Sequence, residues 1–273
     1  MPELPEVETI ANNLRGGSKD DPPVIGRTII GAELYWARTL SVPSPGEFFK
    51  RILGQTIVDV RRRGKFLIIK LSRDFLLIHL RMSGDIFIDM EDEPVRPHDR
   101  LLLYLDGGIR LAFNDTRKFG RVWLVSESED VLAGLGPEPF DPNLTPEVFF
   151  QDLQTHRRQL KPLLLDQTFL AGIGNIYADE SLHRAQLHPL QLSNNLSFEQ
   201  AERLLESIRE VLRLGIKEGG ATIDWVYRGG RFQENFQVYD REGEFCRRCG
   251  TIITRIIVGQ RSTHFCPECQ ELH

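Results

Sequence analysis

Residues 56–80 read TIVDVRRRGKFLIIKLSRDFLLIHL, three short runs rich in Ile, Val, Leu and Phe that are separated by charged or glycine-containing breaks. Runs of this length, bounded by turn residues, are typical of strands. The pattern continues to residue 126, and Asp106-Gly107-Gly108 between two runs is a hairpin turn signal. The expected strands are 56–60, 66–71, 75–80, 85–89, 101–105, 109–113 and 121–125. We therefore predict an antiparallel β-sandwich in this part of the chain.

Helical patterns flank this region on both sides, so the predicted fold class is α+β. Before it, residues 5–15 have a proline at the first helical position and apolar residues at a helical spacing. After it, the Pro- and Gly-rich segment 134–142 indicates a domain boundary. Thr145 then fits a helix cap, and Ser197 with Gln200 fits a capping box. The expected domains are 1–135, a sandwich that begins with a helix; 136–238, a helical domain; and 239–273, a cysteine-containing finger.

The composition excludes several classes of protein. The 273 residues are 41% hydrophobic and 27% charged, which rules out a disordered chain and a collagen-like repeat. No apolar stretch reaches the ~18 residues of a membrane span, and the carboxylates near the N-terminus do not fit a secretory signal. We therefore expect a cytoplasmic protein with no membrane partner, in a compartment where disulfides rarely persist.

Positive charge is concentrated in two parts of a chain whose net charge is −5. Residues 50–82 contain nine Lys and Arg against two Asp, and residues 246–265 contain four Arg and no acid. A phosphate chain responds to the potential within about 8–10 Å and not to the net charge of the whole protein. Two basic patches are therefore compatible with DNA or RNA as a partner. The alternative is that these cations are solvated strand faces.

The four cysteines are spaced as Cys246-x2-Cys249-x16-Cys266-x2-Cys269. Two such pairs can place four thiolates on one tetrahedral ion at ~2.3 Å, and a closed shell of four ligands makes the metal structural, not catalytic. The segment between the pairs suits two strands around Gly259-Gln260. We expect one structural Zn²⁺. The alternatives are reduced or disulfide-bonded pairs, or His264 or His273 in place of one cysteine.

The N-terminus reads Met1-Pro2-Glu3-Leu4-Pro5-Glu6. Because Pro2 is small, Met1 is normally removed, and a secondary amine then heads the chain. α-Amino groups titrate near ~8, far below lysine, so much of this amine is neutral and nucleophilic. It could attack a sugar C1′ and form an iminium ion, with Glu3 and Glu6 at hand to transfer protons. Alternatively, the prolines only stiffen the terminus and the glutamates stabilise a helix dipole.

These features together resemble the bacterial formamidopyrimidine-DNA glycosylase family (Fpg/MutM), base-excision enzymes for oxidised purines. The matching segments are PELPEVET (2–9), RRGK (62–65), HLRMSG (79–84), DTRKFG (115–120), LGPEP (135–139), GIGNIYADE (172–180) and the four-cysteine tail. They follow the family's order along nearly the whole chain. The resemblance implies a catalytic sandwich, a helix–two-turn–helix domain and a β-hairpin zinc finger, with a basic cleft between the lobes.

The resemblance also implies a bifunctional DNA glycosylase and apurinic/apyrimidinic (AP) lyase. Pro2 is then the nucleophile, and Glu3 is the principal proton-transfer group. Glu6 is a supporting carboxylate, and Lys65, which is assigned to the catalytic residues together with Pro2 and Glu3, contacts phosphate beside the lesion. The iminium intermediate would lead to β- and δ-elimination, and the zinc would take no part in the chemistry.

Other matches concern the handling of DNA. Met82, Arg117 and Phe119 match the side chains that fill the space left by an everted base, although from the sequence alone Met82 and Phe119 would be core residues. The residues expected to contact phosphate are His98, Asn175 and Arg261. The loop 219–236 corresponds to the one that covers the everted base through backbone amides. Eversion of a base costs a few kcal/mol, and the side chains that fill the emptied space offset part of this cost.

The expected partner is duplex DNA that contains oxidised bases or abasic sites, bound by a monomer. Two alternatives remain open. One is an endonuclease VIII-like enzyme for oxidised pyrimidines, against which Leu4 argues, because that branch tends to have Gly at the position. The other is a zinc-dependent DNA-binding module that has lost catalysis.

Overall fold

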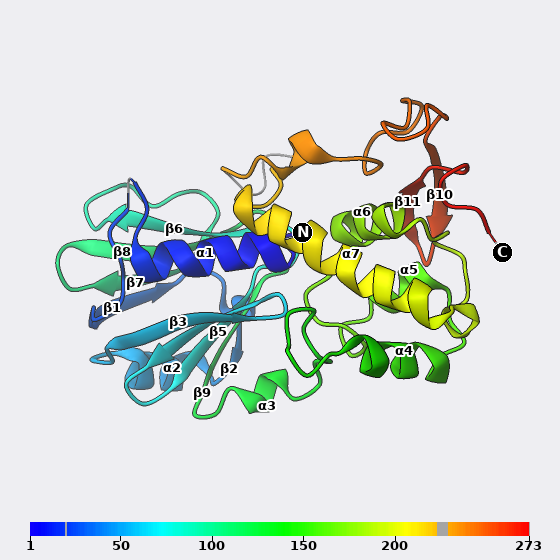
Figure 1. Ribbon diagram of the computed structural model, residues 1–273. Coiled ribbons are helices and arrows are strands. Elements are labelled where there is room, and N and C mark those ends of the chain that lie inside the picture. The colour runs from blue at the N-terminus through cyan, green and yellow to red at the C-terminus, as the bar shows by residue number, and fades with distance from the viewer. Residues whose placement is uncertain (20, 223–228, 273) are drawn as a thin grey trace. The chain divides into compact units, whose positions relative to one another are not determined.

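The computed structural model describes residues 1–19, 21–222 and 229–272 (Figure 1). The chain divides into two units, Met1–Gly134 with Thr222–Gly230, and Leu135–Ala221 with Arg231–His273. The three-domain division, with boundaries after residues 135 and 238, stays a prediction. Residues 223–228 of the loop expected to cover an everted base lie outside the described residues. No described helix has the length and apolar character that a membrane span requires.

Two β-sheets form most of the first unit. The four-stranded sheet has the order β1 (Ile29–Leu34), β7 (Asp99–Leu105), β8 (Ile109–Asp115) and β6 (Gly84–Met90). The five-stranded sheet has the order β2 (Leu40–Val42), β9 (Arg121–Val125), β5 (Phe75–His79), β4 (Phe66–Leu71) and β3 (Ile57–Arg63). Among these described strands, neighbours are antiparallel except for β2 and β9, which are parallel. The predicted β-sandwich is confirmed, with this one parallel edge pair as a difference.

One apolar core joins both sheets and helix α1 (Leu4–Gly16). Alternate strand residues such as Ile69 and Leu103 point into it, because successive side chains of a strand face opposite sides. From the helix, Val7, Ile10 and Leu14 are buried at the spacing of one helical face. The apolar periodicity of the sequence therefore places α1 on the sandwich.

Two cationic side chains fix α1 against β3. Arg62 donates from Nε to Glu8 Oε2 at 2.7 Å. Arg15 donates from Nη2 to the Val60 carbonyl at 2.6 Å. Because Glu8 lies near the start of the helix and Arg62 near the end of β3, the first turns of α1 are held close to the β3–β4 turn.

Local sequence signals match several elements closely. Strands β4 and β9 have the predicted bounds, and the β7–β8 hairpin turns at Gly107 and Gly108, whose φ angles are 83° and 75°. Such positive angles favour glycine. Among the described strands and α-helices of the first unit, the sequence patterns do not single out β1, β2, α2 (Pro45–Ile52) and α3 (Glu129–Leu132). These segments are short or half-exposed, so they carry weak periodicity.

Helices and one hairpin make up the second unit. The described α-helices are α4 (Pro146–Thr155), α5 (Leu160–Leu164), α6 (Asn175–Ala185) and α7 (Phe198–Lys217). Thr145 caps α4 by accepting from the Val148 amide, and Ser197 with Gln200 forms a capping box on α7, as predicted. Strands β10 (Thr254–Val258) and β11 (Arg261–Phe265) pair around Gly259-Gln260. The predicted helical domain with a β-hairpin is thus confirmed.

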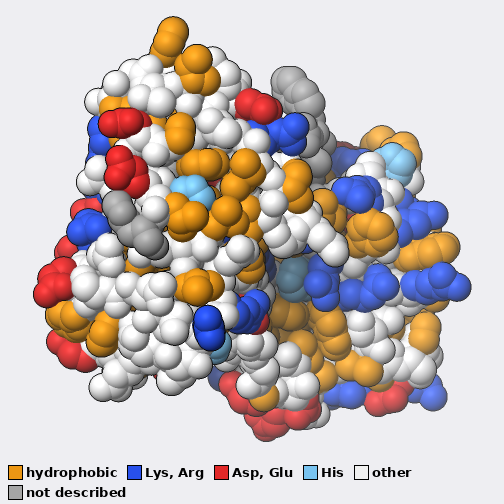
Figure 2. Space-filling view, turned by 90° about the vertical axis from the view of Figure 1, so that its right-hand side faces the viewer, with side chains coloured by type: hydrophobic (Ala, Val, Ile, Leu, Met, Phe, Trp, Pro, Cys, Tyr) orange, Lys and Arg blue, Asp and Glu red, His pale blue; other side chains and the backbone are white. Residues whose placement is uncertain are grey.

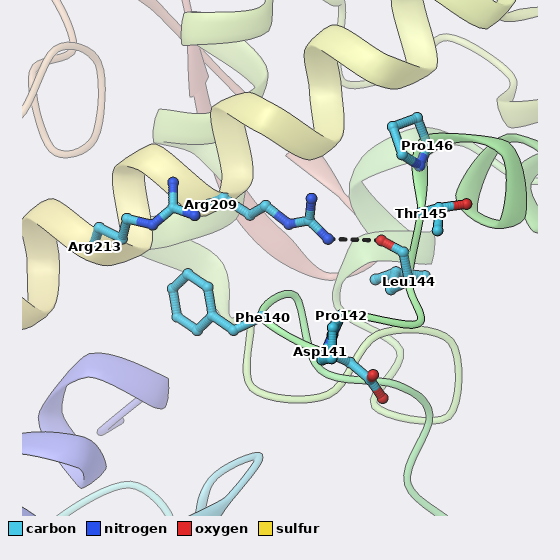
Figure 3. Close-up of a pocket in the computed structure, with 8 residues that line it drawn as sticks. All are labelled: Phe140, Asp141, Pro142, Leu144, Thr145, Pro146, Arg209 and Arg213. Atoms are coloured by element: carbon cyan, nitrogen blue, oxygen red, sulfur yellow. Dashed lines mark hydrogen bonds between the residues drawn. The ribbon is translucent and has the colours of Figure 1, made fainter.

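Helix α7 also holds the segment that leads into α4 (Figure 3). Arg209 donates from Nε to the Pro139 carbonyl at 2.7 Å and from Nη2 to the Leu144 carbonyl at 2.6 Å. The Arg213 guanidinium lies 5.6 Å from the centre of the Phe140 ring, beside a cavity of about 420 Å³. Backbone carbonyls of an irregular segment thereby obtain donors, which fixes the path of this segment along α7.

Candidate functional site

The chain begins with a tightly packed helix start. Pro2 is buried, whereas Met1 is 43% exposed. Glu3 is the N-cap of α1, and its amide donates to Glu6 Oε2 at 2.7 Å, while its own carboxylate accepts from the Glu6 backbone. Two carboxylates at the positive end of a helix dipole are electrostatically favourable. The sequence-predicted residues Pro2, Glu3 and Glu6 are therefore brought together, with both carboxylates in fixed positions.

Lys65 lies in the turn between β3 and β4 and is 5% exposed. Helix α1 packs against both of these strands, and the Arg62–Glu8 ion pair joins the end of β3 to the first turns of the helix. The predicted catalytic lysine and the predicted nucleophile thus come from neighbouring parts of one unit. A lysine amino group is suited to an anion such as phosphate.

His79, at the end of β5, is a buried residue close to Lys65 that the sequence patterns did not identify. Burial, and then the charges of Arg81 and Lys65, lower its pKa from 6.5 to about 3, so the ring is neutral. Its Nδ1 accepts from the Arg81 amide at 3.0 Å, and its ring packs edge-on against Phe66 at 4.7 Å. His79 therefore anchors the loop that carries Met82. The cations in the segments RRGK and HLRMSG were the sequence signal that could have indicated a histidine with a lowered pKa.

The residues predicted to fill an emptied base position lie on two loops. Phe119 is 49% exposed, and the Arg117 guanidinium lies 5.0 Å from its ring centre. Met82 is half-buried in the loop between β5 and β6. An exposed Phe beside an Arg is not a core residue, so the core interpretation of Phe119 is wrong. The space-filling role itself stays a prediction.

The His98 side chain is exposed, and the His98 backbone contacts Asp115 at the end of β8. Its carbonyl accepts from the Asp115 amide at 2.9 Å, and its Nδ1 lies 3.4 Å from an Arg100 guanidinium nitrogen. The neighbouring Asp99 carboxylate accepts from Asn114 at 2.8 Å and from the Arg96 amide at 2.8 Å. The His98 loop is thus fixed at its base while the imidazole remains accessible.

Asn175 and Arg261 come together in the second unit. Asn175 begins α6, and its Nδ2 donates to the Ser262 carbonyl at 3.0 Å, directly after Arg261 in the hairpin. The exposed Arg261 side chain therefore starts next to a helix N-terminus. Amides at such a terminus and a guanidinium are both suited to phosphate.

A buried ion pair that the sequence reasoning missed supports this arrangement. Lys161 Nζ lies 2.6 Å from Asp179 Oδ1, with both side chains 0% exposed. Lys161 also donates to the Ser262 carbonyl at 2.7 Å, and Asp179 accepts from the His264 amide at 2.9 Å. The pair thus ties α5 and α6 to β11. The only hint in the sequence was a lysine within the apolar run LKPLLL.

Glu180, the next residue of α6, holds the segment that leads to the finger. Its buried carboxylate accepts from the amides of Gln237, Val238 and Tyr239 at 2.8–3.1 Å. Burial raises its pKa, and the three amides act in the opposite direction. Adjacent acids of one helix therefore position two separate stretches of the C-terminal region.

The four cysteines form one metal site. One sulfur from each of Cys246, Cys249, Cys266 and Cys269 lies within 4.8 Å of all the others. The Cys246–Cys269 and Cys249–Cys266 sulfur distances are 3.9 and 3.4 Å, close to the ~3.8 Å edge of a tetrahedral zinc–thiolate site. His183 Nε2 lies 3.6 Å from Cys246 Sγ. With all four positions filled by thiolates, the site holds one structural Zn²⁺, as predicted.

Surface charge is unevenly distributed. On the face drawn in Figure 2, Lys and Arg side chains are densest in one part, and most Asp and Glu side chains lie elsewhere. A chain with a net charge of −5 thus presents local positive potential, which is the quantity that a polyanion experiences.

Family models match three consecutive parts of the chain. The formamidopyrimidine-DNA glycosylase N-terminal domain matches residues 1–122, and the H2TH domain of the same glycosylase matches residues 135–226. The zinc finger found in FPG and IleRS matches residues 243–272. Together they cover most of the sequence.

Individual relatives extend over the full length. The formamidopyrimidine-DNA glycosylase of Protochlamydia amoebophila is 42% identical, and the match covers 99% of this chain and 100% of the relative. That of Chloroflexus aurantiacus is 46% identical, with 99% and 98% covered.

Two solved structures are similar throughout. MutM in complex with DNA that contains carbocyclic 8-oxo-G has a TM-score of 0.91 and 37% identity, covering 99% of this chain and 100% of that one. The Lactococcus lactis Fpg in complex with abasic-site DNA has a TM-score of 0.91 and 36% identity, covering 98% and 99%. With a matching fold, metal site and full-length relatives, the chain belongs to the formamidopyrimidine-DNA glycosylase family.

Proposed function

We propose that this protein is a DNA glycosylase that removes oxidised purines, such as 8-oxoguanine and formamidopyrimidines, from duplex DNA and then cleaves the abasic site as an AP lyase. The observation that carries the proposal is the helix start at which Pro2 is followed by Glu3 and Glu6 in a capping box. Titles of similar structures, which describe complexes with 8-oxo-G and abasic-site DNA, support the substrate class.

Pro2 is the nucleophile once Met1 has been removed. Its amine attacks C1′ of the damaged nucleotide, the bond from C1′ to the base breaks, and the base leaves after accepting a proton. Loss of the single amine proton, followed by cleavage of the bond from C1′ to the ring oxygen with protonation of that oxygen, gives an iminium ion between Pro2 and C1′. Glu3 transfers protons in these steps, and Glu6 fixes the Glu3 backbone. Removal of a C2′ proton then permits β-elimination, followed by δ-elimination.

The remaining predicted residues bind and deform DNA. Lys65 contacts the phosphate beside the lesion, and the other phosphate contacts come from His98, Asn175 and Arg261. Met82, Arg117 and Phe119 occupy the space that the everted base leaves. The Zn²⁺ ion stabilises the hairpin that carries Arg261 and takes no part in catalysis. We expect a monomer acting in the bacterial cytoplasm, where the four thiolates stay reduced.

Borohydride trapping tests the proposal. Protein whose mass confirms a chain that begins at Pro2 is incubated with 8-oxoguanine:cytosine duplex and sodium borohydride. A covalent protein–DNA adduct is expected, because borohydride reduces an iminium to a stable amine. A chain with an N-terminal extension before Pro2 is the matched control and should give no adduct. Glu3→Gln should lower the excision rate by about 100-fold or more.

The outcome also separates the alternatives. A preference for thymine-glycol duplex over 8-oxoguanine duplex would assign the protein to the oxidised-pyrimidine branch. Tight binding to lesion DNA without any adduct, from a chain that begins at Pro2, would leave only a DNA-binding module and would refute the enzyme proposal.

A further inference from the structure

Both loops with predicted space-filling residues contain a strained backbone position. Arg81, directly before Met82, has a φ angle of 57°, and Lys118, between Arg117 and Phe119, has a φ angle of 61°. Non-glycine residues in this region cost of order 1 kcal/mol or more, so surrounding contacts must hold them there. The two loops are therefore built to keep one defined shape.

One buried carboxylate connects these loops. Asp115, at the end of β8, is 0% exposed. Its Oδ1 accepts from the Ser83 hydroxyl, in the β5–β6 loop, and from the Arg117 amide at 3.2 Å. Its Oδ2 accepts from the Gly120 amide at 2.7 Å, and the Arg117 amide also donates to Ser83 Oγ at 3.0 Å. Removal of the carboxylate would separate the loops and leave buried donors unsatisfied.

The backbone at the base of both loops is packed so closely that it has no room for an additional Cβ atom. Gly84 and Gly120 both lie against the Phe113 ring, where an added Cβ would come within 2.9 and 2.3 Å of ring carbons. At the tip, Lys118 Nζ lies 4.2 Å from the centre of the Trp36 ring, a cation–π contact. Lys118 is thereby drawn toward Trp36, while Arg117 and Phe119 remain exposed.

We propose that Asp115 is a positioning residue that couples the Met82 loop to the Arg117–Phe119 loop, so that their side chains enter the duplex as one preformed unit. The inference rests on the proposed function. Preorganisation lowers the entropic cost of ordering the loops at the moment of insertion. Its benefit is largest where a paired base must be expelled, and it is smaller where an abasic site has no base to remove.

The test compares two substrates across four forms of the full-length, zinc-loaded protein. Excision from 8-oxoguanine:cytosine duplex and borohydride trapping on abasic-site duplex are measured for wild type, Asp115→Asn, Ser83→Ala and Asp74→Asn. Asp74 is the matched control, a 7%-exposed carboxylate of the same unit that accepts from Arg51 and Gln55 at 2.6 and 2.7 Å. Thermal unfolding of each variant reports any loss of fold.

Asp115→Asn should lower kcat/KM on the paired lesion about tenfold or more and the abasic-site trapping rate less than about threefold. Ser83→Ala, which removes only the link between the loops, should change the two rates in the same unequal way with a smaller amplitude. Combining Ser83→Ala with Asp115→Asn should cost little beyond Asp115→Asn alone, because both changes break one coupling. Asp74→Asn should affect both substrates equally.

Equal losses on both substrates, additive effects in the double variant, or no change in Ser83→Ala would overturn the coupling. If Asp115→Asn fails to fold, the substrate difference in Ser83→Ala decides alone. A wild-type protein without adduct on either substrate would refute the proposed function instead, so the two failures are distinguishable.

Discussion

The loops that carry Met82 and Arg117, and the residues Asn175 and Arg261, are partly exposed features held by buried acids, but by different means. In the first unit, Asp115 accepts hydrogen bonds from a hydroxyl and two amides, and no ion pair of Asp115 occurs within residues 1–19, 21–222 and 229–272. In the second unit, Asp179 is paired with Lys161 at 2.6 Å. A carboxylate that binds amides fixes the shape of nearby loops. An ion pair joins elements that are far apart in the sequence.

The difference follows from what each region must hold. The two loops leave neighbouring strands of sheets that already fix their ends, so short hydrogen bonds suffice. The hairpin lies about a hundred residues beyond α5 and has a small core of its own, which consists of Val238, Ile253 and cysteines. It therefore depends on the metal and on the Lys161–Asp179 pair, and the second region should be the more sensitive to loss of a single group.

Removal of zinc should have the largest effect. Either chelation or Cys249→Ser should unfold the hairpin and lower the affinity for lesion DNA about tenfold or more, because structural zinc supplies ~10–16 kcal/mol in small zinc modules. The β-sandwich, which has its own core, should keep its unfolding transition. Zinc content, DNA affinity and thermal unfolding are measured together. Readdition of Zn²⁺ to the metal-free wild type is the control. Unchanged affinity after verified zinc loss would contradict this prediction.

Breaking the buried Lys161–Asp179 ion pair should have the second-largest effect. Asp179→Asn removes the buried carboxylate that faces the Lys161 ammonium and should destabilise the second unit by about 3–5 kcal/mol. Glu210→Gln is a matched control, since the Arg184–Glu210 pair is about half exposed, and it should cost less than about 1 kcal/mol. Denaturant unfolding of zinc-loaded protein checks both values. Equal costs for the two variants would show that the buried pair has no special role.

Low pH should have a smaller effect on stability, and this effect should arise at His79, which anchors the Met82 loop. Because the folded pKa of His79 is about 3 and the ordinary value is 6.5, the unfolded chain binds a proton that the folded chain excludes. Stability should therefore fall as the pH drops below 6.5, by up to about 3 kcal/mol at pH 4.5. Above pH 6.5 this contribution is complete.

His79→Asn is the variant that isolates this effect. Asn can still accept from the Arg81 amide but does not titrate, so the loss between pH 6.5 and 4.5 should shrink. Arg81 and Lys65 are the charged groups that act on the ring. Urea unfolding at several pH values measures the difference. An identical acid dependence in wild type and variant would rule His79 out as its source.

Local signals explain which elements could be predicted. The caps Thr145 and Ser197, the turn at Gly107-Gly108 and the paired cysteines each act within a few residues, and the structure has all of them as expected. Helix α2 and the parallel β2–β9 pair were missed, because their segments are short and their pairing depends on distant partners. The roles of the predicted site residues remain to be tested by the experiments above.

The amino-acid sequence by itself determined the β-sandwich, the capped helices, the thiolate site and a proline next to two glutamates at the chain start, because these depend on periodicity and spacing within short segments. Only the tertiary structure decided that Asp115 meets Ser83, 32 residues away, and that Lys161 reaches the Ser262 carbonyl, 101 residues away. Buried polar partners are chosen by the packing of whole elements, which excludes water and brings together donors and acceptors from distant segments. No local pattern encodes that choice.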